Sequence, residues 1–371
     1  MPRLLTASPN RMLVHFAETM VFAAIGGTAL GLAGIPGGWL SGSILCVAAA
    51  ALAGRPMHVP LRLNRVIFVL IGTSLGAVVT PETVKGVTTY PVSVAVLLIA
   101  MTAMSWTGAL YLRRIHDWDR VSASLGAAPG ALSQCVAVST ELDADTRGIV
   151  IVQTLRVVII AVGLPSCLAV LGLVAPSTRG VGGAFDLSKL DELALLVVAC
   201  AICGWLAFRI RFPGGILFGA MLASAILHGS GLIHAVMPWW VANAAMICLG
   251  GITGSRFADL PLKLLLRYLG AGLGLFVASL VVAGSFASVL VVWLSVNVSD
   301  AFIAFAPGSA DAMMLLALAL HTDPVFVGAH HMVRILFVSL TMPLFAQHAA
   351  RAEHKPIDEN KLPPATPDDE D

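Results

Sequence analysis

One polar pattern occurs twice in the chain, and each copy interrupts an apolar segment. The first copy is Ala128-Pro129-Gly130, and the second is Ala306-Pro307-Gly308, 178 residues later. An arginine follows in the next apolar segment at the same spacing, Arg156 in the first copy and Arg334 in the second. A bilayer tolerates a broken helix or a buried charge only where protein or a water-filled cavity surrounds it. We therefore expect the two copies to face one another at a polar centre.

The composition indicates an integral membrane protein. Hydrophobic residues make up 58% of the 371 residues and charged residues only 12%, against roughly 25% charged residues in soluble proteins. The net charge is +1, and no basic tract with interleaved aromatic residues is present. This pattern argues against nucleic acid as a partner and leaves the lipid bilayer as the expected surroundings.

Apolar stretches of about 20 residues predict ten membrane-spanning helices. They lie near 15–33, 37–54, 64–80, 91–112 and 147–174, and again near 193–209, 214–230, 241–256, 268–295 and 325–346. Two segments rich in small residues, near 121–140 and 301–320, contain the Pro-Gly pairs and are too interrupted to be simple spans. The predicted fold class is an all-α integral membrane protein.

The duplication extends beyond the Pro-Gly pairs and predicts the domain organisation. Pro36-Gly37-Gly38 corresponds to Pro213-Gly214-Gly215, and Gly72 corresponds to Gly250. The predicted parts are a cytoplasmic leader (1–14), a first membrane repeat (15–174), a linker (175–192), a second repeat (193–346) and a disordered cytoplasmic tail (347–371).

The lysines and arginines predict the orientation of the chain. With both termini in the cytoplasm, 17 of the 22 basic residues lie inside, three lie outside, and Arg156 and Arg334 lie within the membrane. This balance requires each Pro-Gly segment to be a re-entrant hairpin that enters and leaves on one side. Each repeat then has five spans, so the second repeat is inverted relative to the first. Inverted repeats with broken helices at the midplane are typical of secondary transporters.

The candidate binding residues cluster around the two predicted hairpin tips. Broken helix ends expose backbone groups that can bind ions, and polar side chains stand nearby. The predicted substrate-binding set is Pro129, Gly130, Ser133, Gln134, Gln153 and Arg156 from the first repeat, with Pro307, Gly308, Ser309, Asp311, His331 and Arg334 from the second. The arginines suit a carboxylate or phosphate. The structural alternatives are that the polar groups at the hairpin tips, including Ser133, Gln134, Ser309 and Asp311, satisfy one another's hydrogen bonds, and that Arg334 neutralises Asp311.

No metal, cofactor or catalytic residue is predicted. His330 and His331 are adjacent and point about 100° apart on a helix, so they cannot chelate one ion by themselves. His331 lies one turn before Arg334 and is instead a candidate proton-coupling group. Cys200 and Cys203 form a C-x-x-C inside an apolar segment, where we interpret them as small packing residues.

Two pairs of segments resemble the duplicated signature of the membrane AbrB family of bacteria. They are APGALSQCVAVSTELDADTRGIVIVQTLRVVII with APGSADAMMLLALALHTDPVFVGAHHMVRILFV, and IPGGWLSGSILCVAAAALAG with FPGGILFGAMLASAILHGSG. The resemblance covers nearly the whole chain and implies a bacterial inner-membrane protein. The family also carries the labels ammonia monooxygenase and regulator of aidB expression. It is distinct from the small soluble DNA-binding AbrB proteins, which share only the name.

This chain departs from the pattern of the family it resembles. Members commonly have Pro-Gly-Gly with a glutamate shortly after it. Here Ala131 and Ser309 replace the second glycine, and Gln134 and Ala312 stand where the glutamate is expected, although Asp311 lies next to Ala312. These replacements argue against a proton or cation mechanism that depends on that glutamate.

Three functions follow from these observations, and the first is favoured. The chain is expected to be a secondary transporter, not an enzyme, that moves a small solute by alternating access, with anions as the favoured class and Na⁺ or H⁺ as the coupling ion. The alternative is a membrane sensor that affects gene expression indirectly. A membrane monooxygenase would need clustered copper or iron ligands, and the sequence lacks a convincing set. A homo-oligomer is compatible with the sequence.

Overall fold

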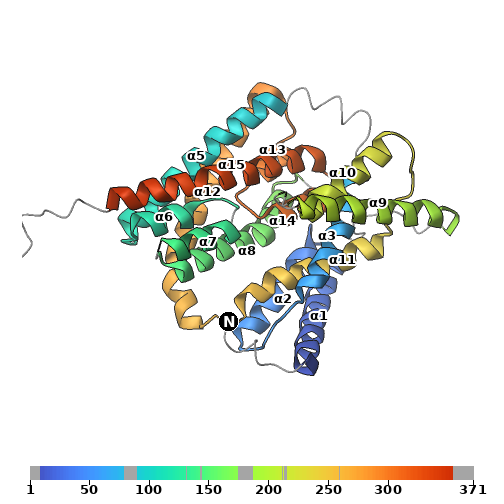
Figure 1. Cartoon of the computed structure of the whole chain (residues 1–371), viewed down its shortest axis with the longest axis horizontal. Helices are drawn as coiled ribbons and strands as arrows, with labels where there is room; N and C mark the ends of the chain where they lie inside the picture. The colour runs from blue at the N-terminus through green and yellow to red at the C-terminus, as the bar shows by residue number, and fades with distance from the viewer. Residues whose placement is uncertain are drawn as a thin grey trace, which may run out of the picture.

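The regular elements in the described part of the chain are helices (Figure 1). The computed structural model describes residues 9–78, 90–130, 132–142, 144–173, 187–210, 212, 215–258 and 260–353. The predicted all-α class is therefore confirmed for these residues.

The described residues of the first half of the chain form five longer helices and one pair of short ones. They are α1 (Pro9–Leu32), α2 (Gly38–Leu52), α3 (Leu61–Gly76), α5 (Tyr90–Ile115), the short pair α6 (Arg120–Ala127) and α7 (Leu132–Glu141), and α8 (Thr146–Val170). Each of the five predicted spans of this half coincides with one of the longer helices. The interrupted segment near 121–140 forms the short pair.

The second half repeats this order. It contains η2 (Leu187–Lys189), α9 (Leu190–Arg209), α10 (Gly215–Gly229), α11 (Trp239–Gly254), η3 (Ser255–Phe257), α12 (Leu262–Leu294), the short pair α13 (Val298–Phe305) and α14 (Ala310–Ala319), and α15 (Pro324–Glu353). The boundaries differ from those predicted at both ends of the chain. Helix α1 begins within the expected leader, and α15 continues into the expected tail.

Five helices in the described part of the chain are long and apolar enough to cross a membrane. They are Met12–Leu32, Tyr90–Ile115, Thr146–Val170, Leu190–Arg209 and Leu262–Leu294. Helices α2, α3 and α10 are apolar but have 15 or 16 residues, so they span only about 22–24 Å at 1.5 Å per residue. The chain therefore has the helices of a multi-pass membrane protein, some of them shorter than the hydrocarbon layer of about 30 Å.

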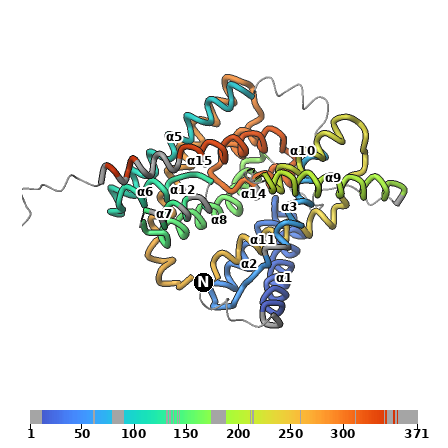
Figure 2. The backbone as a smooth tube through the Cα atoms, in the orientation of Figure 1, coloured from blue at the N-terminus to red at the C-terminus, as the bar shows by residue number. Residues whose placement is uncertain are grey.

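Helices of the two halves of the chain pack against each other in a reciprocal way. Helix α3 of the first half packs on α10 of the second, and α11 of the second packs on α2 of the first (Figure 2). Glycines permit both contacts, because a Cβ atom on Gly72 would lie 2.5 Å from the Leu217 carbonyl oxygen. A Cβ atom on Gly250 would lie 2.9 Å from the Leu40 carbonyl oxygen. Neither distance is compatible with a side chain, so both positions require glycine at this spacing.

A second group of helices surrounds the short pairs. Helix α5 packs on α12 and α6, and α15 packs on α6, α13 and α14. Figure 1 shows α5, α6, α12 and α15 together on one side of the molecule, with α1, α2 and α11 on the other. The short helices are therefore held mainly by the group formed from α5, α8, α12 and α15.

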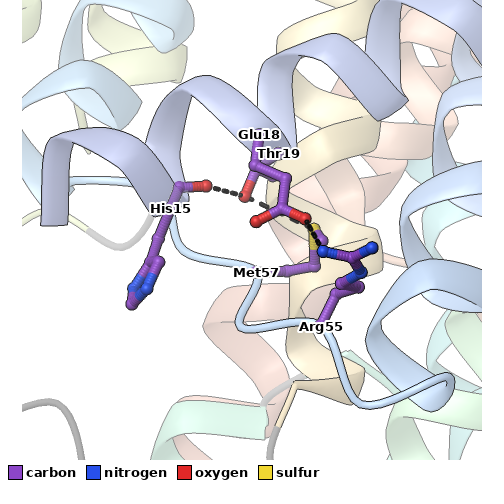
Figure 3. Close-up of polar contacts among 5 residues, drawn as sticks. All are labelled: His15, Glu18, Thr19, Arg55 and Met57. Atoms are coloured by element: carbon purple, nitrogen blue, oxygen red, sulfur yellow. Dashed lines mark hydrogen bonds and ion pairs between the residues drawn. The ribbon is translucent and has the colours of Figure 1, made fainter. Parts of the chain in front are cut away.

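The connection between α2 and α3 is fixed to α1 by polar contacts (Figure 3). Arg55 forms an ion pair with Glu18 at 3.2 Å. The Thr19 hydroxyl donates to the His15 carbonyl at 2.7 Å and accepts from the His58 backbone N–H at 2.9 Å. Because Thr19 is fully buried, these bonds satisfy a hydroxyl that would otherwise be costly. These contacts hold together one end of the first group of helices, which is formed by α1, α2, α3, α9, α10 and α11.

Candidate functional site at two broken helices

The first break separates α6 from α7 at Pro129-Gly130. The Asp119 side chain caps the start of α6 by accepting from the Ser122 backbone N–H at 2.7 Å. The helix ends at Ala127, and Gly130 has a φ of +91°, a conformation that residues with a Cβ atom rarely adopt. The two helices have 8 and 10 residues, about 12 and 15 Å at 1.5 Å per residue, so neither can cross the membrane.

The second break separates α13 from α14 at Pro307-Gly308. Asn297 caps α13 by accepting from the Ser299 backbone N–H at 3.1 Å, at the position equivalent to Asp119. Helix α13 ends at Phe305, and α14 starts at Ala310 after Ser309, whose side chain makes no capping bond. The first N–H groups of α14 thus begin at the break without a side-chain cap.

A buried arginine holds the carbonyl end of each broken helix. Arg156 donates from Nη1 to the Ala127 carbonyl at 3.3 Å and from Nη2 to the Ala128 carbonyl at 2.8 Å. Arg334 donates from Nη1 to the Ala306 carbonyl and from Nη2 to the Gly308 carbonyl, both at 2.6 Å. Both side chains are 1% exposed. Each guanidinium therefore satisfies carbonyls that the break removes from helical bonding, at the negative end of the helix dipole.

The polar residue one turn before each arginine also binds its own half-helix. Gln153 donates from Nε2 to the Leu125 carbonyl at 2.7 Å, and His331 donates from Nε2 to the Ile303 carbonyl at 3.2 Å. The two carbonyls are equivalent in the duplication, and both side chains are buried. Glutamine and histidine thus perform the same task at the two breaks.

The two breaks meet at Gly130. A Cβ atom on Gly130 would lie 3.1 Å from Nε of Arg334 and 3.5 Å from its Cζ. The arginine that holds the second break therefore packs against the backbone of the first. Helix α14 also contacts the start of α2, because a Cβ atom on Gly37 would lie 3.1 Å from a methyl group of Leu316 in α14. The same Cβ atom would lie 3.3 Å from Pro165 of α8.

The side chains of Ser133, Gln134 and Asp311 lie outside the described part of the structure. Their backbones are described and fall in the first turns of α7 and α14. The remaining predicted site residues, in the two breaks and on α8 and α15, are brought to these two helix ends. The proposed pairing of Arg334 with Asp311 stays a prediction.

Sequence reasoning missed one pair of residues that supports the breaks. The Asp145 backbone N–H donates to the Ser122 hydroxyl at 2.9 Å, and the Asp323 backbone N–H donates to Oδ1 of Asp300 at 2.8 Å. These bonds join the first turn of each broken helix to the start of α8 and of α15. Ser122 and Asp300 are also 178 residues apart, so the duplication could have identified them.

His330 points to a different partner from His331. Its Nδ1 lies 2.7 Å from the Phe326 carbonyl, and its Nε2 lies 2.9 Å from the Ser93 hydroxyl on α5. His330 therefore links α15 to α5. Within the described residues no three histidine, cysteine or carboxylate side chains come together as metal ligands would.

Comparison with known proteins identifies the family. The apolar helices place the chain among helical membrane proteins, and a family model described as transition state regulatory protein AbrB matches residues 39–350. The chain belongs to this AbrB family. It is 26% identical over 352 residues to "Uncharacterized protein YhjN" of Bacillus subtilis strain 168, covering 88% of this chain and 91% of that protein.

A second relative is a protein of Escherichia coli strain K12 that carries the provisional name regulator AbrB. The identity is 25% over 295 residues, which cover 78% of this chain and 84% of that protein. Both relatives are therefore similar to this chain over most of their length.

Proposed function

We propose that this chain is a secondary transporter of the bacterial inner membrane that moves a small anionic solute by alternating access. The observation that carries the proposal is the pair of buried arginines at two broken helices, with Arg334 against Gly130 of the other break. A transporter needs a polar site that is surrounded by protein at the centre of apolar helices. The breaks and their arginines supply such a site.

The electrostatics favour an anion. Two guanidinium groups and the uncapped start of α14 contribute positive charge, and an Arg156 ion pair is absent among the described side chains, where Arg55 pairs with Glu18. Arg156 has five N–H donors, and the two bonds to Ala127 and Ala128 use two of them. The rest of its fork suits a carboxylate or phosphate oxygen.

The packing supports a mechanism of alternating access. The short helices belong to the group formed with α5, α8, α12 and α15, and α14 touches α3 of the other group. Sliding of one group along the other would expose the breaks to each side of the membrane in turn.

We further propose two inverted repeats with re-entrant hairpins, and both termini in the cytoplasm. The proposed coupling ion is Na⁺ or H⁺, with His331 as the proton carrier. The protein is proposed to be no enzyme, and a homo-oligomer is compatible with this mechanism.

Flux through purified protein in liposomes tests the proposal. Vesicles loaded with succinate, acetate, phosphate or sulfate should exchange at least one of these anions faster than protein-free vesicles. Choline and glucose serve as matched cationic and neutral probes, and we expect no flux of either. Selective flux of choline or glucose would contradict the anion assignment.

Reporter fusions test the inverted topology separately. A reporter after Met237, before α11, should read periplasmic, and a reporter after Pro261, before α12, should read cytoplasmic. The reason is that Arg256 in η3, with Lys263 and Arg267 in the first turns of α12, favours the inside. The opposite pair of readings would exclude inverted repeats while leaving the binding site untested.

A membrane sensor is the second candidate, favoured by the name of the Escherichia coli relative. A sensor would bind an anion at the same breaks without turnover. Thermal stabilisation of the purified protein by an anion, together with no flux of that anion, would support the sensor. Stabilisation with flux supports the transporter.

A further inference from the structure

A groove on the outer surface of the second group leads from an apolar face to a basic end. Its apolar part, of about 500 Å³, is lined by Leu98, Ile99, Ala103 and Trp106 of α5 and by Phe337 of α15. A second cavity of about 340 Å³ shares Trp106 and Phe337 with it and continues toward the end of α5. Figure 1 shows α5 and α15 side by side, with α6 near the end where both helices finish.

The second cavity ends among basic and hydroxyl side chains. It is lined there by Arg113 of α5, by Arg120 and Ser124 of α6, and by Thr341 and His348 of α15. Arg114 lines an adjoining pocket with Arg113 and Asp117. The described charged side chains at this end are three arginines against the two carboxylates Asp117 and Asp119, a net positive charge.

The dimensions of the groove match one leaflet of a bilayer. Leu98 and Arg113 are fifteen residues apart on one helix, about 22 Å at 1.5 Å per residue. Half of a bilayer with its headgroups measures about 20–22 Å. Trp106 lies between these ends and is 68% exposed, as an interfacial tryptophan beside lipid would be.

We propose that this groove binds one anionic phospholipid, with an acyl chain along α5 and the phosphate at Arg113 and Arg120. Charge complementarity selects the occupant, because an apolar groove alone would accept any lipid whereas the arginines favour a negative headgroup. The floor of the cavity includes Ala128, whose carbonyl accepts from Arg156. A bound lipid would therefore lie against the first break and couple the membrane composition to it.

Native mass spectrometry of the full-length protein tests the lipid site, with dioleoyl phosphatidylglycerol and dioleoyl phosphatidylcholine as probes. The wild type should retain one phosphatidylglycerol in preference to phosphatidylcholine. Arg113→Gln and Arg120→Gln should each weaken this retention about fivefold, the effect of one basic residue near an anionic lipid. Arg209→Gln, an exposed arginine at the end of α9, is the matched control and should retain the lipid.

A second variant tests the apolar part without a change of charge. Thr102 is exposed and lines both cavities, so Thr102→Trp should fill the groove and reduce phosphatidylglycerol retention with little effect on the melting temperature of the lipid-free protein. Equal retention of the two phospholipids, or of oleate in place of phosphatidylglycerol, would overturn the proposal. The proposal would also be overturned if Arg209→Gln lost phosphatidylglycerol as much as Arg113→Gln does. A wild type that holds no lipid and forms a dimer, which Thr102→Trp dissociates, would overturn it as well.

Discussion

The two breaks use the same backbone geometry with different side chains. In the first, Asp119 and Gln153 bind the short helix, and Ser122 of that helix binds the start of α8. In the second, Asn297 and His331 bind the short helix, and Asp300 of that helix binds the start of α15. Of the polar side chains that bind the two short helices, the arginine is the one that both breaks share. Several residue types can therefore cap a helix or bind a single carbonyl. Two carbonyls at a helix end are bound each time by an arginine, whose planar guanidinium has two parallel donors.

The breaks also differ in how they depend on each other. Gly130 has a φ of +91° and packs against Arg334, whereas Gly308 is not among the described glycines with positive φ. A Cβ atom on Gly308 would instead meet the flexible side chain of Met313 at 2.8 Å. The first break therefore requires glycine for its backbone and for its neighbour, and the second requires only a small adjustment.

Removal of either arginine is expected to have the largest effect. Arg156→Met orphans the buried carbonyls of Ala127 and Ala128, at about 1–3 kcal/mol per group. Arg334→Met orphans the carbonyl of Gly308, whereas the Ala306 carbonyl keeps its bond from the Gly308 backbone N–H at 2.8 Å. Arg334→Met also removes the packing contact with Gly130, so both variants should lower the melting temperature. Thermal unfolding in detergent measures both, with the exposed Arg209→Met as control. Equal melting of all four proteins would show that the carbonyls have other partners.

The two glycines should respond unequally to alanine. Gly130→Ala places a Cβ atom in a left-handed backbone and 3.1 Å from Arg334, so we expect a loss of about 1–2 kcal/mol from the backbone alone. Gly308→Ala should cost less, since Met313 can change rotamer. Melting curves of the two variants compare them directly. A larger loss for Gly308→Ala would reverse this view of the two breaks.

Exchange of the neighbouring polar residues is expected to have the smallest effect. His331→Gln supplies an amide donor for the Ile303 carbonyl, as Gln153 does for Leu125, so stability should change by less than about 1 kcal/mol. His331→Leu removes the donor and is the matched control that should melt lower. If His331→Gln is as damaging as His331→Leu, the imidazole has a role that the bond to Ile303 does not explain.

Much of the fold could be predicted from the sequence because apolar length is a strong signal. All ten predicted spans coincide with helices, and the two interrupted segments are pairs of short helices. The helix ends were less predictable. Helix α12 starts at Leu262 and not near 268, because its first turns contain the basic residues Lys263 and Arg267 and lie outside the apolar stretch. Hydropathy detects the apolar part alone.

The sequence could predict where the two broken helices and their arginines lie in the chain, but not which groups the arginines contact. The spacing of 178 residues located Arg156 and Arg334, and burial of both is as expected for charges among apolar helices. The spacing did not show that each arginine would bind its own half-helix, because a linear pattern holds no information on which carbonyls a break exposes. It also left Ser122 and Asp300 unnoticed, since a serine and an aspartate do not look alike.

The central claim is that the arginines bind a transported anion in addition to the helix ends. Anion flux in liposomes carrying Arg156→Lys or Arg334→Lys tests it most directly, with Arg209→Lys as control. Lysine keeps the charge but cannot bridge two acceptors in a plane. We therefore expect near-normal expression and a flux that is reduced about tenfold or more, as loss of one charge-assisted hydrogen bond predicts. Full flux in both lysine variants would contradict the claim and leave the arginines as structural clamps of the broken helices.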